Sequence, residues 1–124
     1  MSGQRLLVVE DDRFLRRACE KSLRQRGYVV SVAADGEEGL RLARAELPDL
    51  VLLDVLMPRM TGVEVLRALR EAEATRGMRV LVLSNSSREE DMAEIGRLGV
   101  AGYWVKANLS LQELGDLVAR VLES

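Results

Sequence analysis

The sequence predicts an α/β fold in which five parallel strands alternate with five helices. Short apolar runs recur five times along the chain, and each has the composition of a strand that is buried on both faces. A segment with the apolar spacing of an amphipathic helix follows each run. Residues that cap helices stand at the start of several of these segments. Alternating strands and helices favour a parallel sheet with helices on both of its faces.

The first strand and helix begin the chain. We expect a strand over residues 5–9, and Asp12 is suited to cap a helix over residues 13–26, which Gly27 ends. The apolar residues of this helix recur on one side, which we expect to face the core: Leu15, Ala18, Cys19 and Leu23. A single cysteine can form no internal disulfide, so a buried thiol is the expected state of Cys19.

The second pair is a strand over residues 28–33 and a helix that Asp35 and Gly36 open and that runs through Glu46. Pro48 prevents its extension, because proline cannot continue a helix. The residues expected to point inward from this helix are Leu40, Ala43 and Leu47.

The remaining elements follow the same pattern. We expect strands over residues 50–53, 79–84 and 102–105, and a last helix over residues 111–122. Three further helix starts carry a hydroxyl residue with a glutamate three positions later, which is the spacing of a capping box. These pairs are Thr61 with Glu64, Ser87 with Glu90, and Ser110 with Glu113.

Right-handed crossovers make a doubly wound (βα)5 sandwich the simplest closure of these elements. We expect the strand order 2-1-3-4-5, which places the switch point of the sheet between the first and third strands. A chain of 124 residues is long enough for one such domain and too short for two ordinary ones. The expected organisation is therefore one domain over residues 1–124.

Composition excludes several functional classes. A net charge of -2 and a pI near 5.3 offer no broad attraction to nucleic acid or to an anionic membrane, so no direct nucleic-acid partner is expected. The sequence has no signal peptide and no membrane-spanning segment, and a cytoplasmic location is the default expectation. The absence of histidine removes the usual general base and the commonest transition-metal ligand. Any chemistry is then expected from carboxylates, hydroxyls and a few cations.

Polar residues collect where the predicted strands end. Glu10 and Asp11 follow the first strand, Asp54 ends the third, Ser84 ends the fourth, and Lys106 follows the fifth. The carboxyl ends of parallel strands share one edge of the sheet, so these groups are expected to converge near the switch point.

The three carboxylates predict a metal site. Clustered carboxylates raise one another's pKa unless a cation lies among them. Oxygen ligands without histidine or cysteine favour a hard divalent ion, and Mg²⁺ suits one or two carboxylates with waters. Glu10, Asp11 and Asp54 are therefore the expected ligands. The alternative for Glu10-Asp11-Asp12 is that this triplet only caps the following helix.

Ser84 and Lys106 supply a hydroxyl and a point cation, which we expect on the side of the site opposite the metal. A group with several negative oxygens would fit between them, which indicates phosphoryl transfer with Asp54 as the in-line nucleophile. Asp54 would become an acyl phosphate, and the donor must come from outside the chain. The plainer alternatives are a solvated lysine at a strand end and a serine that caps the next turn.

Over essentially its whole length, the sequence resembles the receiver domain of two-component response regulators of the chemotaxis-regulator type. The resemblance rests on motifs in a characteristic order and spacing, namely Val8-Val9-Glu10-Asp11, Leu52-Leu53-Asp54 with Met57-Pro58 and Gly62, Val82-Leu83-Ser84, and Gly99 through Tyr103 to Lys106. It implies a flavodoxin-like fold and a role in a phosphorelay.

The resemblance also implies the roles of individual residues. Asp54 would accept a phosphoryl group from a phosphohistidine on a partner histidine kinase or phosphotransfer protein. Mg²⁺ would be held by Asp11, Asp54 and the backbone carbonyl of Leu56, with Glu10 acting largely through water. The hydroxyl and ammonium named above would contact the phosphoryl oxygens.

In this family the hydroxyl residue moves toward the acyl phosphate and an aromatic residue turns inward behind it, which here are Ser84 and Tyr103. Trp104 is expected on the other face of the same strand, in a packing role. Output is expected as altered partner binding at the surface of the fourth helix, the fifth strand and the fifth helix. The chain is then a signalling switch rather than an enzyme, although it catalyses its own phosphorylation and dephosphorylation.

The sequence departs from the family pattern at three places. Ala107 replaces the proline that usually follows the lysine, so a cis peptide bond there is no longer cheap. Asn85 stands where a very small residue is typical, in the space that Tyr103 would enter. Ala101-Gly102 lacks the acidic pair common in regulators with winged-helix DNA-binding partners, which argues against that output class and its usual dimer.

Two other functions compete with this interpretation. A Mg²⁺-dependent phosphatase of the aspartyl-phosphate type would share the nucleophile and the metal. Such enzymes carry a second aspartate two residues after the first, where this chain has Leu56. A receiver-like interaction module that ignores phosphate is the other candidate, and the joint presence of the five polar site residues argues against it.

Overall fold

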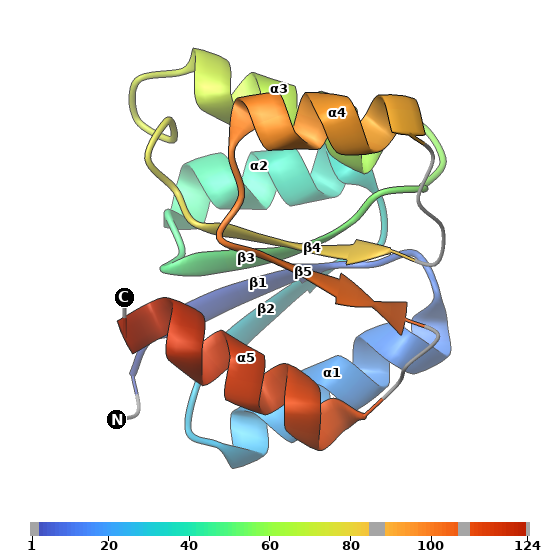
Figure 1. Cartoon of the computed structure of the whole chain (residues 1–124). Coiled ribbons are helices and arrows are strands. Elements are labelled where there is room, and N and C mark those ends of the chain that lie inside the picture. The colour runs from blue at the N-terminus through green and yellow to red at the C-terminus, as the bar shows by residue number, and fades with distance from the viewer. Residues whose placement is uncertain (1–2, 85–88, 107–109, 124) are drawn as a thin grey trace.

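A computed structural model describes residues 3–84, 89–106 and 110–123. Over these residues, five strands alternate strictly with five helices (Figure 1). The strands are β1 (Arg5–Val9), β2 (Val29–Ala33), β3 (Leu50–Asp54), β4 (Val80–Ser84) and β5 (Gly102–Val105). The helices are α1 (Arg13–Gln25), α2 (Gly36–Glu46), α3 (Gly62–Glu71), α4 (Glu89–Leu98) and α5 (Leu111–Glu123). No helix in that part of the chain is long and apolar enough to cross a membrane.

The strands form one parallel sheet in the order β2-β1-β3-β4-β5, which confirms the predicted doubly wound, flavodoxin-like sandwich. Its register places the polar strand ends together. Val9 pairs with Leu53, so the residues that follow them, Glu10 and Asp54, lie next to each other at the carboxyl edge of the sheet. Ser84 ends β4 at the same edge of the sheet.

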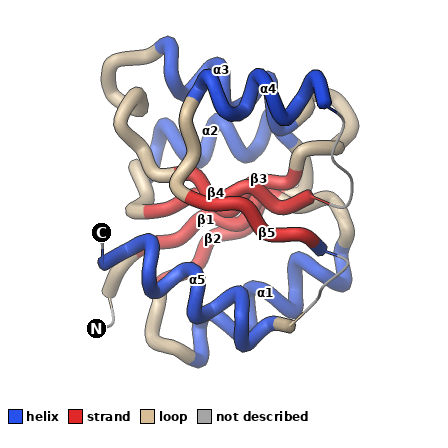
Figure 2. The backbone as a smooth tube through the Cα atoms, in the orientation of Figure 1, coloured by secondary structure: helices blue, strands red, loops and turns tan. Residues whose placement is uncertain are grey.

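Helices α1 and α5 cover one face of the sheet, and α2, α3 and α4 cover the other (Figure 2). Side chains alternate along each strand, so the sheet separates two buried clusters. In β1, Leu6 and Val8 join the cluster under α1 and α5, whereas Leu7 and Val9 join the cluster on the opposite face. Every residue of β3 and β4 is buried, as expected for inner strands of a parallel sheet.

The two aromatic residues of β5 divide between these layers. Trp104 is 8% exposed and packs in the layer of α1 and α5, which confirms its predicted packing role. Tyr103 is half-buried and packs against the cluster in the layer of α2, α3 and α4. Cys19 of α1 is fully buried, as predicted, and burial raises the pKa of its thiol to about 12.

Hydroxyl caps fix two of the three predicted helix starts. Thr61 and Glu64 form both halves of a capping box at α3, with N···O distances of 3.2 and 2.9 Å. At α5, the hydroxyl of Ser110 accepts a hydrogen bond from the main-chain N–H of Glu113 at 3.2 Å. The third predicted cap, at Ser87, lies outside the described residues. The predicted element boundaries otherwise differ from the observed ones by one residue at most.

The prediction that Leu47 points into the core is wrong. Its side chain is 53% exposed, and its backbone adopts the left-handed conformation with φ of 47°. Leu47 is the residue that closes α2, and its N–H donates to the carbonyl of Ala43. A left-handed residue at a helix end turns the chain out of the helix, so its side chain leaves the face that Leu40 and Ala43 share.

Arg70, in the last turn of α3, connects three segments of the layer that contains α4. Its guanidinium donates hydrogen bonds of 2.8 to 3.0 Å to four main-chain carbonyls, those of Arg76, Met78, Leu98 and Gly99. The first two carbonyls belong to the connection between α3 and β4, and the last two belong to the end of α4. One side chain therefore anchors the C-terminal end of α4.

Candidate functional site

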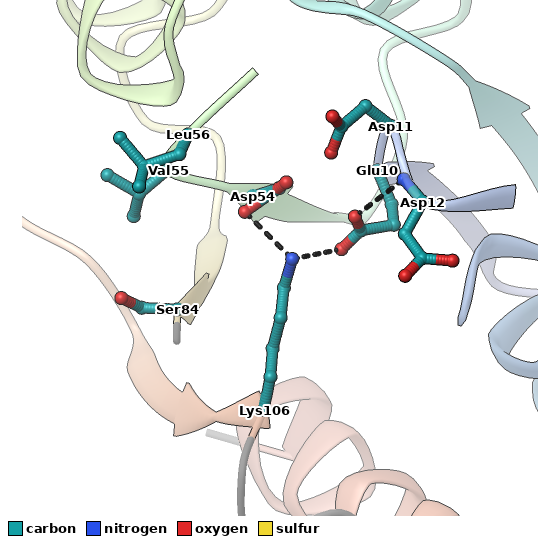
Figure 3. A pocket seen from close by; sticks show the side chains of 8 residues that line it. All are labelled: Glu10, Asp11, Asp12, Asp54, Val55, Leu56, Ser84 and Lys106. Carbon is teal, nitrogen blue, oxygen red and sulfur yellow. Dashed lines mark hydrogen bonds and ion pairs between the residues drawn. The ribbon is translucent and has the colours of Figure 1, made fainter. Parts of the chain in front are cut away.

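A cavity of about 250 Å³ opens at the carboxyl edge of the sheet. All five side chains that were predicted to converge there line it (Figure 3). The complete lining is Glu10, Asp11, Asp12, Asp54, Val55, Leu56, Ser84 and Lys106. The strand order thus assembles one polar site from the first, third, fourth and fifth strands.

Three carboxylates form an acidic cluster in this cavity. Glu10 and Asp54 are almost completely buried, whereas Asp11 is exposed. Each of the three offers one oxygen, and these atoms lie within 4.8 Å of one another. The N–H of Glu10 donates to the carbonyl of Ala33 at 3.0 Å, and its Oε2 accepts the N–H of Asp12 at 2.9 Å. The predicted acidic cluster is present, and it could hold a metal ion.

Helix capping explains only part of the acidic triplet. Oδ1 of Asp12 accepts the N–H groups of Phe14 and Leu15, at 2.9 and 3.2 Å, so Asp12 is the N-cap of α1 as predicted. Glu10 instead directs Oε1 toward Lys106, at 2.7 Å. The alternative that the triplet does nothing but cap the helix therefore fails for Glu10.

The ammonium of Lys106 lies between two of the carboxylates. Its Nζ is 2.7 Å from Oε1 of Glu10 and 3.0 Å from Oδ1 of Asp54, and the lysine side chain is only 11% exposed. The alternative of a solvated lysine is therefore wrong. Its position also differs from the sequence-based expectation, which placed Lys106 opposite the metal ligands. In this structure, the cation among the clustered carboxylates is the lysine itself.

Burial has the largest effect on the pKa of Asp54, the predicted phosphoacceptor. Desolvation raises the pKa of Asp54 to about 7, the Lys106 ammonium opposes this rise, and the carboxyl groups of Asp11 and Glu10 add to it. Burial lowers the pKa of Lys106, but the contacts with Glu10 and Asp54 outweigh this effect and leave the pKa raised. Lys106 is therefore a permanent cation at neutral pH, while Asp54 is poised between its two protonation states.

The donor atoms of this cluster are suited to a hard divalent cation. Oδ2 of Asp54 is buried and accepts no hydrogen bond from any residue that the structure describes. A buried carboxylate oxygen without a partner is costly, and a cation removes that cost. The remaining donors are carboxylate oxygens as well, and oxygen ligands are those that Mg²⁺ prefers.

Two further residues of the predicted site, Ser84 and Leu56, also line the cavity. Ser84 is 4% exposed and lines the cavity, with its hydroxyl directed away from Asp54 in Figure 3. Leu56 lines the cavity with a half-exposed side chain, and the role of its carbonyl stays a prediction. Asn85 and Ala107, the two departures nearest the site, lie outside the described residues.

Gly62 supports Asp54 from behind. A Cβ atom at this glycine would lie 2.1 Å from the carbonyl oxygen of Asp54 and 2.8 Å from Cα of Val55. The N–H of Gly62 donates to the carbonyl of Val55 at 2.8 Å. The start of α3 therefore packs directly on the main chain that carries Asp54, at a distance that only glycine permits.

Arg16 also contacts this site, although no sequence motif identifies it. Its Nη1 donates to the carbonyls of Glu10 and Asp11, at 2.9 and 3.4 Å. Every residue type has a main-chain carbonyl, so contacts with these carbonyls leave no pattern in the sequence. Arg16 is also one of 16 arginines in the chain. The available signal was its spacing, since a helical residue one turn beyond Asp12 can reach back to the preceding loop.

Known proteins resemble this chain over most of its length. The sequence model of the response regulator receiver domain matches residues 6–119. A curated relative, the transcriptional regulatory protein PrrA of Mycobacterium leprae, is 40% identical over 121 residues, which are 98% of this chain and 49% of that protein. The chain spans about half the length, or less, of the curated relatives it matches.

Solved structures with this fold cover nearly the whole chain. The chemotaxis response regulator CheY4 of Vibrio cholerae superposes with a TM-score of 0.88 at 31% identity, over 97% of this chain and 99% of that one. A CheY-like receiver domain protein from Methanospirillum hungatei gives a TM-score of 0.91 at 26% identity, over 98% and 95% of the two chains. Both likenesses extend across all five strand and helix pairs.

Proposed function

Because this chain belongs to the family of response regulator receiver domains, we propose that it is a switch operated by phosphorylation of Asp54. The phosphoryl group comes from a phosphohistidine on a partner histidine kinase or phosphotransfer protein. The environment of Asp54 is the strongest support for this proposal. Asp54 is a buried carboxylate at the end of a central strand, with one oxygen 3.0 Å from an ammonium and the other without a hydrogen-bond partner among the described residues.

The carboxylate acts as nucleophile without a separate base. Its oxygen attacks phosphorus, an O–P bond forms, and the P–N bond to the donor histidine breaks, with the electron pair leaving on the imidazole nitrogen. Only the ionised form of Asp54 can attack. A pKa of about 7 leaves a substantial ionised fraction at neutral pH, and the Lys106 ammonium stabilises that fraction.

The proposed metal ligands are Glu10, Asp11, Asp54 and the main-chain carbonyl of Leu56. Mg²⁺ held there would neutralise negative charge on the transferring group. Lys106 contributes a second positive charge, and its two carboxylate contacts keep its ammonium inside the cavity. Ser84 lines the same cavity and is proposed to donate its hydroxyl to a phosphoryl oxygen.

The proposed output is a change in partner binding at the surface of α4, β5 and α5. Ser84 and Tyr103 are the proposed switch residues that connect the site to this surface. They belong to adjacent strands, since Val82 pairs with Tyr103 and Ser84 with Val105. Met92 of α4 and Val105 of β5 are large apolar residues that remain exposed, at 36% and 41%. Both offer apolar area to a partner.

The chain is proposed to act on itself rather than on a pool of substrates. It catalyses its own phosphorylation and then loses the group as water attacks the acyl phosphate. A phosphatase acting on many phosphoesters would need a general acid near the leaving group. Leu56, two residues after Asp54, places an apolar side chain in the cavity instead.

The test is an intact-mass measurement after incubation with Mg²⁺ and a small acyl phosphate donor. We expect one phosphoryl adduct that requires Mg²⁺, that is absent from Asp54→Asn, and that decays without other proteins. Absence of any adduct on the folded wild-type chain would overturn the proposal in favour of a module that ignores phosphate. Rapid continuous turnover of many phosphoesters would indicate the phosphatase.

A further inference from the structure

The loop of residues 10–12, between β1 and α1, carries two of the three clustered carboxylates. Its ends are well anchored. Glu10 is bonded to Ala33 of β2 through its N–H, and Asp12 caps α1 through its side chain. Asp11, between them, projects its carboxylate toward the cavity from an exposed position. Burial therefore does not fix the direction of the Asp11 side chain, which depends strongly on the conformation of its backbone.

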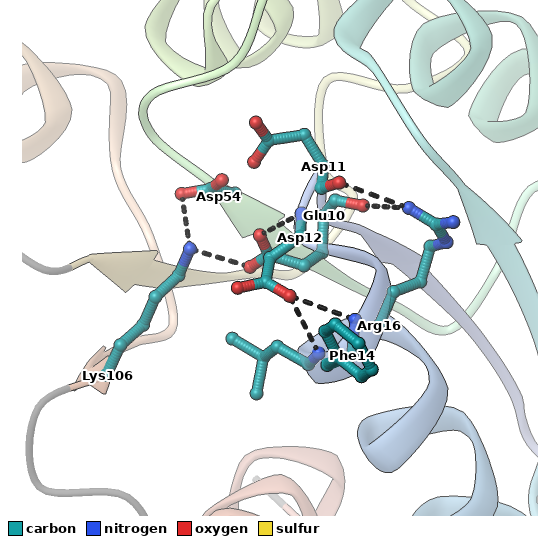
Figure 4. A network of polar contacts seen from close by, with 8 residues as sticks. Glu10, Asp11, Asp12, Phe14, Arg16, Asp54 and Lys106 are labelled. Atoms are coloured by element: carbon teal, nitrogen blue, oxygen red, sulfur yellow. Dashed lines mark hydrogen bonds and ion pairs between the residues drawn. The ribbon is translucent and has the colours of Figure 1, made fainter.

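Arg16 holds that backbone. Its Nη1 donates to the carbonyl of Glu10 at 2.9 Å and to the carbonyl of Asp11 at 3.4 Å (Figure 4). These two carbonyls belong to the peptide groups on either side of the Asp11 Cα atom. Because a peptide group is planar, holding both groups restricts the two backbone torsions of Asp11. The direction of its Cα–Cβ bond is thereby restricted as well.

The guanidinium reaches the loop from outside the acidic cluster. In Figure 4 it lies on the far side of the loop from Lys106 and Asp54. It donates to main-chain oxygens and leaves the carboxylate oxygens of Glu10 and Asp11 for other partners. A guanidinium in this position can orient a metal ligand without binding the metal itself.

We propose that Arg16 is a positioning residue for divalent-cation binding, which acts by fixing the main chain that carries Asp11. The inference rests on the magnesium site of the proposed function. It concerns the affinity for Mg²⁺ and not the transfer of a phosphoryl group.

Charge and geometry make opposite predictions for the loss of Arg16. A guanidinium near a cation site repels the cation, so removal of its charge alone would strengthen Mg²⁺ binding. Loss of the two carbonyl contacts frees Asp11 and weakens binding. Outer partners of metal ligands typically change metal affinity by about tenfold to a hundredfold. The sign of the effect therefore identifies the cause.

The experiment is a titration of the metal-free protein with MgCl2, followed by NMR amide shifts, for wild type, Arg16→Met and Arg17→Met. Arg17 is the matched control, because it is the neighbouring residue of α1 and is exposed on a different surface groove. We expect Arg16→Met to bind Mg²⁺ about tenfold more weakly than wild type. Arg17→Met should bind as tightly as wild type or slightly more tightly, since it loses only charge.

Arg16→Lys serves as a second variant, since it keeps the charge but replaces the guanidinium by a shorter, compact ammonium. We expect it to bind Mg²⁺ several-fold more weakly than wild type, with amide shifts confined to the loop of residues 10–12. If Arg16→Met fails to fold by its NMR spectrum, Arg16→Lys decides the question. Unchanged or tighter binding in a folded Arg16 variant would overturn the inference.

Failure of the inference differs from failure of the proposed function. A wild-type chain that forms the Mg²⁺-dependent adduct, with Arg16 variants that bind Mg²⁺ normally, would retain the function and overturn the role of Arg16. A wild-type chain that binds Mg²⁺ but forms no adduct would overturn the function, while weaker binding in the variants would still support Arg16. Absence of Mg²⁺ binding in the wild type would overturn the inference.

Discussion

The ammonium nitrogen of Lys106 lies 3.0 Å from Oδ1 of Asp54, although β4 separates their two strands in the sheet. The contact is possible because both residues stand at the carboxyl ends of their strands, where the long lysine stem reaches across the end of β4. It links the margin of the sheet to its centre.

Lys106→Met should lower the stability of the metal-free protein at pH 7.5. The change leaves the carboxylates of Glu10 and Asp54 buried without their cation, and loss of one partner of a buried ion pair costs about 3–5 kcal/mol. Urea denaturation followed by circular dichroism measures the change in unfolding free energy. Lys21→Met, at the other lysine of the chain and exposed on α1, is the control and should be nearly neutral. An equal effect of both substitutions would show that the ion pairs contribute no stability.

Stability should also depend on pH through Asp54. Folding raises the pKa of Asp54 from 3.8 to about 7. Between these two pH values, Asp54 is protonated in the folded chain and ionised in the unfolded chain. The contribution of Asp54 is therefore favourable below about pH 4, and it is lost as the pH rises through 7. We expect the unfolding free energy of wild type, relative to Asp54→Asn, to fall between pH 5 and pH 8 in the absence of divalent cations. A difference that stays constant or rises over this range would contradict the raised pKa.

Gly62→Ala should destabilise the domain by about 1–3 kcal/mol, because the added Cβ would meet main-chain atoms of Asp54 and Val55 that cannot move independently. Gly77→Ala is a suitable control, since a Cβ there meets nothing within 4 Å. The control should be neutral or slightly stabilising. Thermal unfolding of both variants checks the prediction. Equal melting temperatures would mean that α3 shifts without cost.

Arg70→Met should cost about 2 kcal/mol or more, since it leaves four main-chain carbonyls without their charged donor. Hydrogen exchange should localise the effect to the C-terminal end of α4 and to the connection before β4. Arg76→Met removes an exposed side chain from the same connection and is the matched control. Uniformly faster exchange over the whole chain would instead indicate a general loss of stability.

Much of the fold was predictable because this sequence changes character abruptly at its strand ends. The apolar runs stop at Glu10 and at Asp54, so two strand ends could be located to within a residue. Leu47 was misplaced because the apolar spacing of α2 continues past the last helical residue. Periodicity records side-chain type, whereas a left-handed helix end depends on local backbone geometry.

The residues of the site were predictable as a set, but their contacts were not. Strand order decides that Glu10, Asp54 and Lys106 meet. Alternating strands and helices predict a parallel sheet, and the order 2-1-3-4-5 is one of the two common arrangements of such a sheet. Whether a lysine stem turns toward two acids depends on its rotamers and on the packing around it, which leave no trace in residue spacing. The hydrogen bonds of Arg16 end on main-chain oxygens and are invisible for the same reason.

The placement of Trp104 determines what an optical experiment on this protein can detect. The chain has a single tryptophan, and its indole is buried in the layer of α1 and α5, on the opposite face of the sheet from Tyr103 and α4. Tryptophan fluorescence therefore reports the packing of α5 and global unfolding. A rearrangement confined to the α4 layer would leave the emission unchanged, so its detection calls for a dye or an isotope label on that side.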